Sequence, residues 1–256
     1  MVDGSARSVG VGVVVPHDMA HDRELWRWAP PGVTLYFTRT ARVENGPADA
    51  TVGTIESISK VRAVEDSVRC LLDTEAAAYA YACTSCSFVR GHVGERKLVE
   101  GMRDAGAPAA VTTSGALVEA LRSLGVTRVA AATPYNDPLT ALFASFLAEA
   151  GMTLAASTNL GLSSGIKNVS PETTMDLIRR ADRPDAEAVC VSCTNLATYD
   201  VIAPLEQELG KPVVTANQAT MWAAARLAGR HATGDGQWLL RATGGQHGNL
   251  AVDRRQ

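Results

Sequence analysis

Short apolar runs rich in valine and alanine alternate along the chain with longer segments whose apolar residues recur at helical spacing. This alternation is typical of repeated βα units on a parallel sheet, so the pattern predicts an α/β protein. The apolar runs predict strands over residues 9–15, 33–38, 76–82, 127–133, 152–158, 187–192 and 212–216.

Capping signals mark the helices between these strands. Asp137 and Pro138 resemble an N-cap followed by a first-turn proline, and Gly151 stands just beyond the last apolar residue of that helix. Ser170 and Pro171 open the next helix in the same way. Between the predicted elements, only residues 44–57 resemble a linker.

A short motif occurs twice, each time where an apolar run ends. The first copy reads "ACTS" at residues 82–85, and the second reads "SCTN" at residues 192–195. The repetition predicts two similar α/β halves, which we bound at residues 1–112 plus 217–256 and at residues 113–216. Because ligands bind beyond the carboxyl ends of parallel strands, we expect both motifs in one cleft between the halves.

The composition narrows the classes of partner. The chain has 256 residues and a formal net charge of -3, with its basic residues scattered among acidic ones. This distribution offers no basic stripe to a nucleic acid and no polybasic patch to a membrane. No apolar run reaches the ~20 residues of a spanning helix. Five cysteines, an odd number, fit the reduced thiols of a cytoplasmic protein better than a disulfide framework.

The cysteines allow several kinds of site. The CxxC pairs Cys83/Cys86 and Cys190/Cys193 supply the count for a four-cysteine zinc site, yet roughly a hundred residues separate them, against the usual ~15 to 20. Cys190 also falls inside a predicted strand rather than on a turn. A thioredoxin-like redox pair is a weaker alternative, because it needs only one CxxC. We expect Cys70 and Cys190 to be ordinary buried thiols.

The sharper hypothesis keeps only Cys83 and Cys193, one from each half. At the end of a strand, the backbone N–H groups of the following turn or helix lower the pKa of a thiol. Two such thiols across a cleft can act as base and acid, or as nucleophile and proton donor. The next residues offer hydroxyls, an amide and N–H groups suited to a carboxylate or an enediolate: Thr84, Ser85, Thr194 and Asn195.

The stretches "ACTSCSFVRG" and "SCTNLATYDVIAPLEQELGKPVVTANQATMWAA" together resemble the aspartate/glutamate racemase superfamily. Within it, they are similar to the branch of maleate cis-trans isomerases and arylmalonate decarboxylases. The resemblance covers most of the chain. It implies two Rossmann-like halves related by a pseudo-twofold axis, each a short, mostly parallel sheet flanked by helices. It also implies catalysis in the cleft without metal or cofactor.

By this resemblance, Cys83 matches the first catalytic position of the family and Cys193 the second. The family's substrate-binding positions match Thr84, Ser85, Tyr135 and Asn168. Arylmalonate decarboxylases have glycine where Cys83 stands and keep only the second cysteine. The presence of both cysteines therefore favours an isomerase or a racemase.

One loop departs from the family pattern. Maleate isomerases carry an asparagine shortly after the proline of the first strand, whereas this chain reads Pro16, His17 and Asp18. An aspartate there repels a substrate carboxylate unless it is protonated or turned away. Asp18 is therefore a candidate for binding an amine, amide or ring nitrogen. The alternative is that Asp18 caps a short helix beginning near Arg23, or lies in solvent.

The leading hypothesis is a cofactor-independent isomerase of a small carboxylate, with Cys83 as nucleophile and Cys193 as acid/base. The alternatives among enzymes are a two-base racemase of amino acids or hydantoins and an arylmalonate decarboxylase-like enzyme. The alternative outside enzymes is a zinc-stabilised binding protein that uses four cysteines. The resemblance also implies a homo-oligomer, a dimer or a tetramer.

Overall fold

The computed structural model describes residues 8–42 and 49–244, with the backbone alone at 242–244. Its strands form two four-stranded parallel sheets. The first, in the order β2-β1-β3-β4, contains β1 (Val9–Val15), β2 (Val33–Arg39), β3 (Ala78–Tyr81) and β4 (Ala110–Thr112). The second, in the order β6-β5-β7-β8, contains β5 (Arg128–Tyr135), β6 (Thr153–Leu162), β7 (Ala188–Val191) and β8 (Val213–Thr215).

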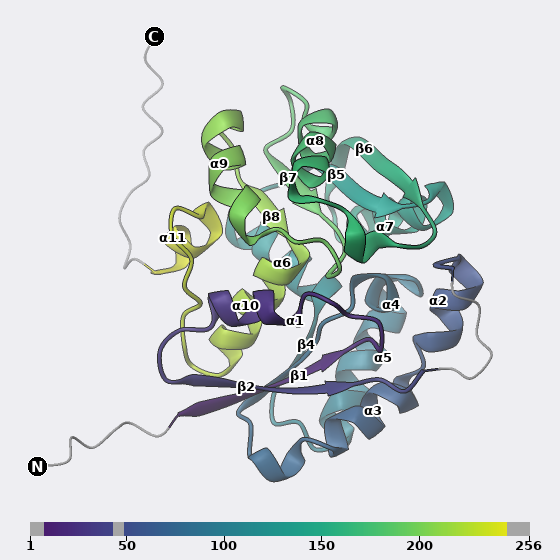
Figure 1. Cartoon of the computed structure of the whole chain (residues 1–256), viewed down its shortest axis with the longest axis vertical. Coiled ribbons are helices and arrows are strands. Elements are labelled where there is room, and N and C mark those ends of the chain that lie inside the picture. Colours follow the sequence, from purple (N-terminus) through teal and green to yellow (C-terminus); the bar gives the residue numbers. More distant parts are fainter. Residues whose placement is uncertain (1–7, 43–48, 245–256) are drawn as a thin grey trace, which may run out of the picture.

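The two sheets repeat one strand order, so β1 corresponds to β5 and β3 to β7. The α/β class and the architecture of two similar halves are thereby confirmed, and Figure 1 shows one sheet in each half of the molecule. The predicted boundaries of the halves stay a prediction. The sequence did not predict β4, because Ala110–Thr112 contains a single valine, whereas the equally short β8 contains two.

Helices connect the strands and pack on both sheets. Their bounds are α1 (Asp22–Leu25), α2 (Val52–Ile58), α3 (Val61–Arg69), α4 (Thr84–Phe88), α5 (Gly91–Asp104), α6 (Thr113–Ser123), α7 (Asp137–Glu149), α8 (Pro171–Ala181), α9 (Tyr199–Leu209), α10 (Ala216–Leu227) and α11 (Trp238–Gly244), with 3-10 turns η1 (Trp26–Trp28), η2 (Leu72–Thr74) and η3 (Ile166–Asn168). Helices α6 and α10 pack against each other near the middle of the molecule (Figure 1). Within the described ranges, no helix has the length and apolarity to cross a membrane.

Two glycines of β1 lie where aromatic rings of the neighbouring strands leave no room for a side chain. A Cβ atom on Gly12 would lie 2.6 Å from the ring of Tyr79, and one on Gly10 would lie 2.7 Å from the ring of Tyr36. Neighbouring strands therefore place aromatic rings where β1 has no side chain. This close packing aligns β1 between β2 and β3, and it positions the loop that follows Val15.

The local sequence signals predicted the cap of one helix correctly, and two other local predictions were wrong. The Ser170 side chain caps α8 as predicted, accepting a hydrogen bond from the N–H of Thr173. The cap of α7 is Asn136 rather than Asp137, because Asn136 accepts from the N–H of Leu139. The predicted linker over 44–57 is wrong at its end, where α2 forms; residues 43–48 lie outside the described residues.

All five cysteines carry free thiols. Cys190 is fully buried in β7, as predicted. Cys70 is exposed, so the prediction of a buried thiol there is wrong. Its position at the end of α3 explains the difference, because the apolar face of that helix buries Val64 and Val68 while Cys70 follows on the solvent side.

Candidate active site

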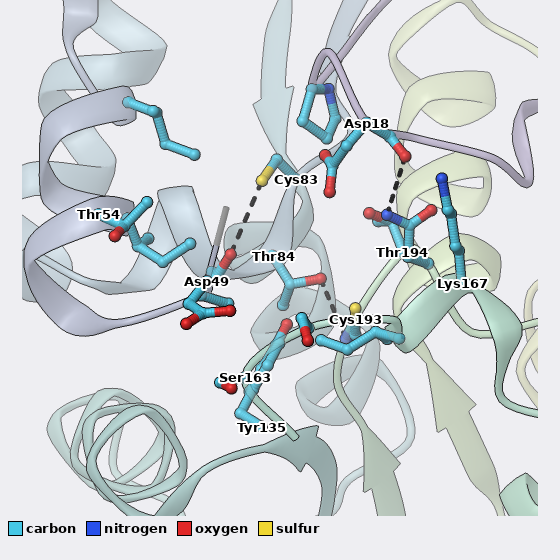
Figure 2. A pocket seen from close by; sticks show the side chains of 18 of the residues that line it. Asp18, Asp49, Thr54, Cys83, Thr84, Tyr135, Ser163, Lys167, Cys193 and Thr194 are labelled. Atoms are coloured by element: carbon cyan, nitrogen blue, oxygen red, sulfur yellow. Dashed lines mark hydrogen bonds between the residues drawn. The ribbon is translucent and has the colours of Figure 1, made fainter. Parts of the chain in front are cut away.

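A cavity of about 390 Å³ lies between the two halves, where the carboxyl ends of their strands meet. Cys83, which follows β3, and Cys193, which follows β7, both line it, and Figure 2 shows Thr84 between them. The structure brings eight of the predicted site residues onto its wall: Asp18, Cys83, Thr84, Ser85, Tyr135, Cys193, Thr194 and Asn195.

Asn168 is the predicted site residue that lies elsewhere. It is exposed at the end of η3, whereas the preceding Ile166 and Lys167 line the cavity. A 3-10 turn has about three residues per turn, so successive side chains point in different directions. The loop that carries Asn168 therefore borders the cavity, and the match of Asn168 itself to a binding position stays a prediction.

Cys83 is held in extended backbone geometry at the N-cap of α4. The Ser87 hydroxyl fixes this start by donating to the carbonyl of Cys83 at 2.8 Å. The neighbouring Cys86 thiol, acting as a hydrogen-bond donor, lowers the pKa of Cys83 more than burial raises it, and the backbone N–H of Cys86 adds to the effect. The Ser85 hydroxyl lies 3.9 Å from the Cys83 sulfur. This thiol is therefore disposed to ionise.

Cys193 has a different backbone and a different pKa. Its φ of 92° lies in the left-handed region, which is strained for a residue with a side chain. Burial raises the pKa of this thiol to about 12, against the smaller lowering effects of the Asn195 N–H and Tyr135. Cys193 is therefore a protonated thiol at neutral pH.

Two polar contacts hold the cysteines and their neighbours in place. The hydroxyl oxygen of Thr84 accepts a hydrogen bond from the N–H of Cys193 at 3.2 Å, which joins the two halves at the site. The Tyr135 hydroxyl accepts from Ser192 at 3.3 Å. Burial raises the pKa of Tyr135 well above its ordinary value, so its phenol stays protonated at neutral pH.

Asp18 and Asn195 are hydrogen-bonded neighbours on the cavity wall. The side chain of Asn195 accepts from the N–H of Ala20 at 2.9 Å and donates to the carbonyl of Asp18 at 3.3 Å. Asn195 therefore anchors this loop with the amide that the sequence assigned to substrate. The N-cap of α1 is His21, so the alternative in which Asp18 caps that helix is wrong. The Asp18 charge raises the pKa of both catalytic-site thiols, which places its carboxylate toward them.

Part of the cavity wall comes from residues that the sequence did not indicate. Helix α2 contributes Thr54, Ile55 and Ile58, and the loop after β6 contributes Ser163 and Lys167. The loop after β6 follows the same strand-end rule that predicted the cysteines, so it was within reach of sequence reasoning. Helix α2 was not, because its sequence resembles a linker.

The segment before α2 is tied to the opposite half. The N–H of Ala50 donates to the carbonyl of Ser163 at 2.5 Å, and the Asn136 amide donates to the carbonyl of Ala50 at 3.3 Å. These bonds hold α2 over the cavity. Charged residues of both signs line the rim beside it: Arg42, Asp49 and Lys167.

The four cysteines of the two CxxC pairs do not converge. Among the residues that the structure describes, no three His, Cys, Asp or Glu side chains are grouped so that they could hold a metal ion. Cys190 lies inside β7 and is fully buried, away from the cavity that Cys193 lines. The zinc alternative therefore lacks its four-cysteine ligand set.

Two parallel α/β halves, each contributing one cysteine to a shared cavity, define an enzyme of the aspartate/glutamate racemase-like class. The chain belongs to the arylmalonate decarboxylase family, whose model matches residues 45–240.

Relatives of two activities are similar to this chain. It is 38% identical over 173 residues to the arylmalonate decarboxylase of Bordetella bronchiseptica, covering 66% of this chain and 72% of that protein. It is 31% identical over 169 residues to the maleate isomerase of Nocardia farcinica, covering 62% and 67%. A solved arylmalonate decarboxylase variant, with one glycine changed to cysteine and one cysteine to serine, has a TM-score of 0.80 and 31% identity, covering 91% of this chain and 98% of that chain.

Proposed function

We propose that this protein is a cofactor-independent cis-trans isomerase of a small unsaturated dicarboxylate or related carboxylate, similar to maleate isomerase. The observation that carries the proposal is the opposite shift of two pKa values on one cavity. The pKa of Cys83 is lowered by its thiol neighbour, whereas burial raises that of Cys193 to about 12. Environments that separate two titratable groups in this way assign a nucleophile and an acid.

In the first step, the Cys83 thiolate forms a bond to one carbon of the substrate double bond. The π electron pair moves to the other carbon and into its carboxylate, which becomes an enediolate. The hydroxyls of Thr84, Ser85 and Tyr135 face the same cavity and stabilise this developing charge as donors. The resemblance assigns the same residues to carboxylate binding.

In the second step, the former double bond is a single bond and can rotate. The enediolate then returns its electron pair, the double bond re-forms in the trans geometry, and the carbon–sulfur bond breaks to release the Cys83 thiolate. Cys193, a protonated thiol on the same cavity, donates its proton toward the enediolate and takes it back as the double bond re-forms, so that no net proton is transferred.

The competing function is decarboxylation of an arylmalonate. The 38% identity to a decarboxylase favours it. By the resemblance described above, decarboxylases have glycine where this chain has Cys83. Cys83 also lies on the cavity with a lowered pKa, which supports a role in chemistry rather than in packing.

Proton NMR in deuterium oxide tests the proposal directly. Maleate, phenylmalonate, amino acids and hydantoins are each incubated with the protein, with Cys83→Ser as the inactive control and Cys190→Ser as the matched thiol control. We expect conversion of maleate, or of a substituted maleate, to its trans isomer. Loss of carbon dioxide from phenylmalonate without any isomerisation would identify a decarboxylase. Deuterium at the α-carbon of an amino acid or hydantoin would identify a racemase.

A further inference from the structure

The proposed mechanism leaves one buried thiol of the site unused. Cys86 is 3% exposed, on the first turn of α4, and its thiol interacts with that of Cys83. Cys83 lines the main cavity, whereas Cys86 lines a second, smaller cavity, beside Lys60 and Arg90. A low-pKa thiol open to small molecules thus has a second thiol beside it.

The spacing of the pair suits a disulfide. Cys83 is the extended N-cap residue of α4 and Cys86 is the third residue of that helix, so the Cys83 side chain lies beside the first turn that carries Cys86. A disulfide needs about 3.5–4.5 Å between the two Cβ atoms, which a small local movement of this first turn can provide. The pair Cys190/Cys193 has the same spacing in sequence, but Cys190 lies inside β7 and Cys193 beyond its end. It serves as an internal comparison.

A third group lies beside the two thiols. The Tyr81 hydroxyl is fully buried, and no hydrogen-bond partner of normal geometry is found for it among the described residues. Its electrostatic neighbours are Cys86 and Cys83. A buried hydroxyl without a partner is costly, by about 1–3 kcal/mol. Its interactions with the two thiols place this hydroxyl as a proton donor beside the sulfurs.

We propose that Cys83 and Cys86 are a reversible oxidation site, which a small hydroperoxide converts to a disulfide. The Cys83 thiolate attacks the hydroperoxide, the O–O bond breaks, an alcohol or water leaves, and Cys83 becomes a sulfenic acid. The Cys86 sulfur then attacks the Cys83 sulfur, the S–O bond breaks, and water leaves with a proton that Tyr81 can relay. The two sulfurs lose two electrons in total, and the hydroperoxide gains them.

The disulfide removes the nucleophile of the proposed isomerase and is reversed by a thiol reductant. Its formation needs no substrate, so it goes beyond the proposed function and holds whichever reaction the site catalyses. Exchange with a dithiol would restore both thiols. Direct overoxidation of Cys83 to a sulfinic acid would not be reversed in this way. Cys86 would thus protect Cys83 from irreversible oxidation, and the disulfide would inactivate the site until it is reduced.

The experiment uses the full chain with Cys70→Ser, which removes the exposed thiol. Reduced protein is treated with stoichiometric hydrogen peroxide, alkylated and digested with trypsin. We expect the peptide of residues 70–90 to lose about 2 Da and to carry no alkyl group, and dithiothreitol to reverse both changes. Turnover, where a substrate is known, should fall and recover in parallel. The peptide mass tests the disulfide even if no substrate is found for the turnover assay.

The matched control adds Cys86→Ser, or Cys86→Ala if the serine variant does not fold. In either variant, Cys83 should gain oxygen irreversibly instead of forming a disulfide. Tyr81→Phe should slow disulfide formation severalfold, and Cys190→Ser should leave it unchanged. The proposal is overturned if the unchanged CxxC pair gains oxygen at Cys83 without losing two hydrogens, or if the peroxide links Cys190 to Cys193 instead.

Discussion

The two Cys-Thr motifs end equivalent strands of equivalent sheets, yet they create different thiols. After Cys83 the chain enters α4 at once, and the thiol receives donors from that turn. After Cys193 the backbone turns through a left-handed conformation, and α9 begins only at Tyr199. One thiol has its pKa lowered and the other has it raised. Similar sequence at symmetric positions therefore produces an asymmetric pair.

A contact between the halves covers the start of α9. The Glu24 carboxylate accepts the N–H groups of Thr198 and Tyr199 at 2.5 and 2.6 Å. These are donors at the start of α9, and Glu24 also binds the Asn217 amide. The first half therefore occupies the N-terminus of α9, whereas the N-terminus of α4 remains beside Cys83.

The largest expected effect comes from removing either thiol. Cys83→Ser and Cys193→Ser should each lower turnover on the order of 1,000-fold, because a serine hydroxyl is neither a comparable nucleophile nor a comparable acid. Cys190→Ser should retain most turnover, since Cys190 does not line the cavity in the structure. Steady-state kinetics on the substrate found by NMR measure all three. Equal losses at all three positions would contradict an active pair.

Cys193→Gly separates chemistry from backbone strain at the second motif. Glycine adopts a φ of 92° without strain, so this variant should be inactive yet melt no lower than the wild type. A large drop in melting temperature would show that the Cys193 side chain has a structural role.

Alkylation measures the difference between the thiols directly. In a Cys70→Ser background, iodoacetamide at pH 7 should modify Cys83 at least ~100-fold faster than Cys193, because reactivity follows the thiolate fraction. The pKa of Cys193 near 12 leaves almost none of its thiolate at that pH. Peptide mapping over time gives both rates. Faster labelling of Cys193 would reverse the assigned roles.

Asp18→Asn should change the substrate preference and the first thiol together. The Asp18 charge raises the pKa of Cys83 and would repel a substrate carboxylate. Its removal should lower the pKa of Cys83 and improve turnover of maleate, by about fivefold for each kcal/mol of repulsion relieved. Asp49→Asn is the matched control, since Asp49 lines the same cavity. An unchanged preference between mono- and dicarboxylates would remove Asp18 from substrate recognition.

The smallest expected effect concerns Glu24, whose carboxylate joins the two halves at the start of α9. Burial raises its pKa above 4.5, so the folded state holds this proton more tightly than the unfolded state. Its contribution to the free energy of unfolding is therefore fully present below pH 4.5 and is lost as the pH rises through the folded pKa. Urea titrations between pH 4.5 and 8 should show this decline. Glu24→Gln should flatten it, and an identical slope in the variant would contradict the assignment.

Much of the fold could be predicted because its signals are local. The valine-rich run at β1 and the Ser170 cap of α8 report their own neighbourhoods, and both were found where predicted. Signals failed where a local pattern was too short or too ordinary. The three residues of β4 contain a single valine, and α2 has the composition of a linker.

The sequence by itself determined the repeated motif, its place at strand ends and hence the meeting of two cysteines in one cleft. Tertiary structure alone decided which thiol ionises, because each pKa depends on burial and on how the turn after the cysteine places its donors. It also turned Asp18 toward the thiols, used Asn195 to anchor that loop, and left Asn168 outside the cavity. The positions of most strands follow from short apolar runs, whereas electrostatics at the site depends on distances that only packing establishes.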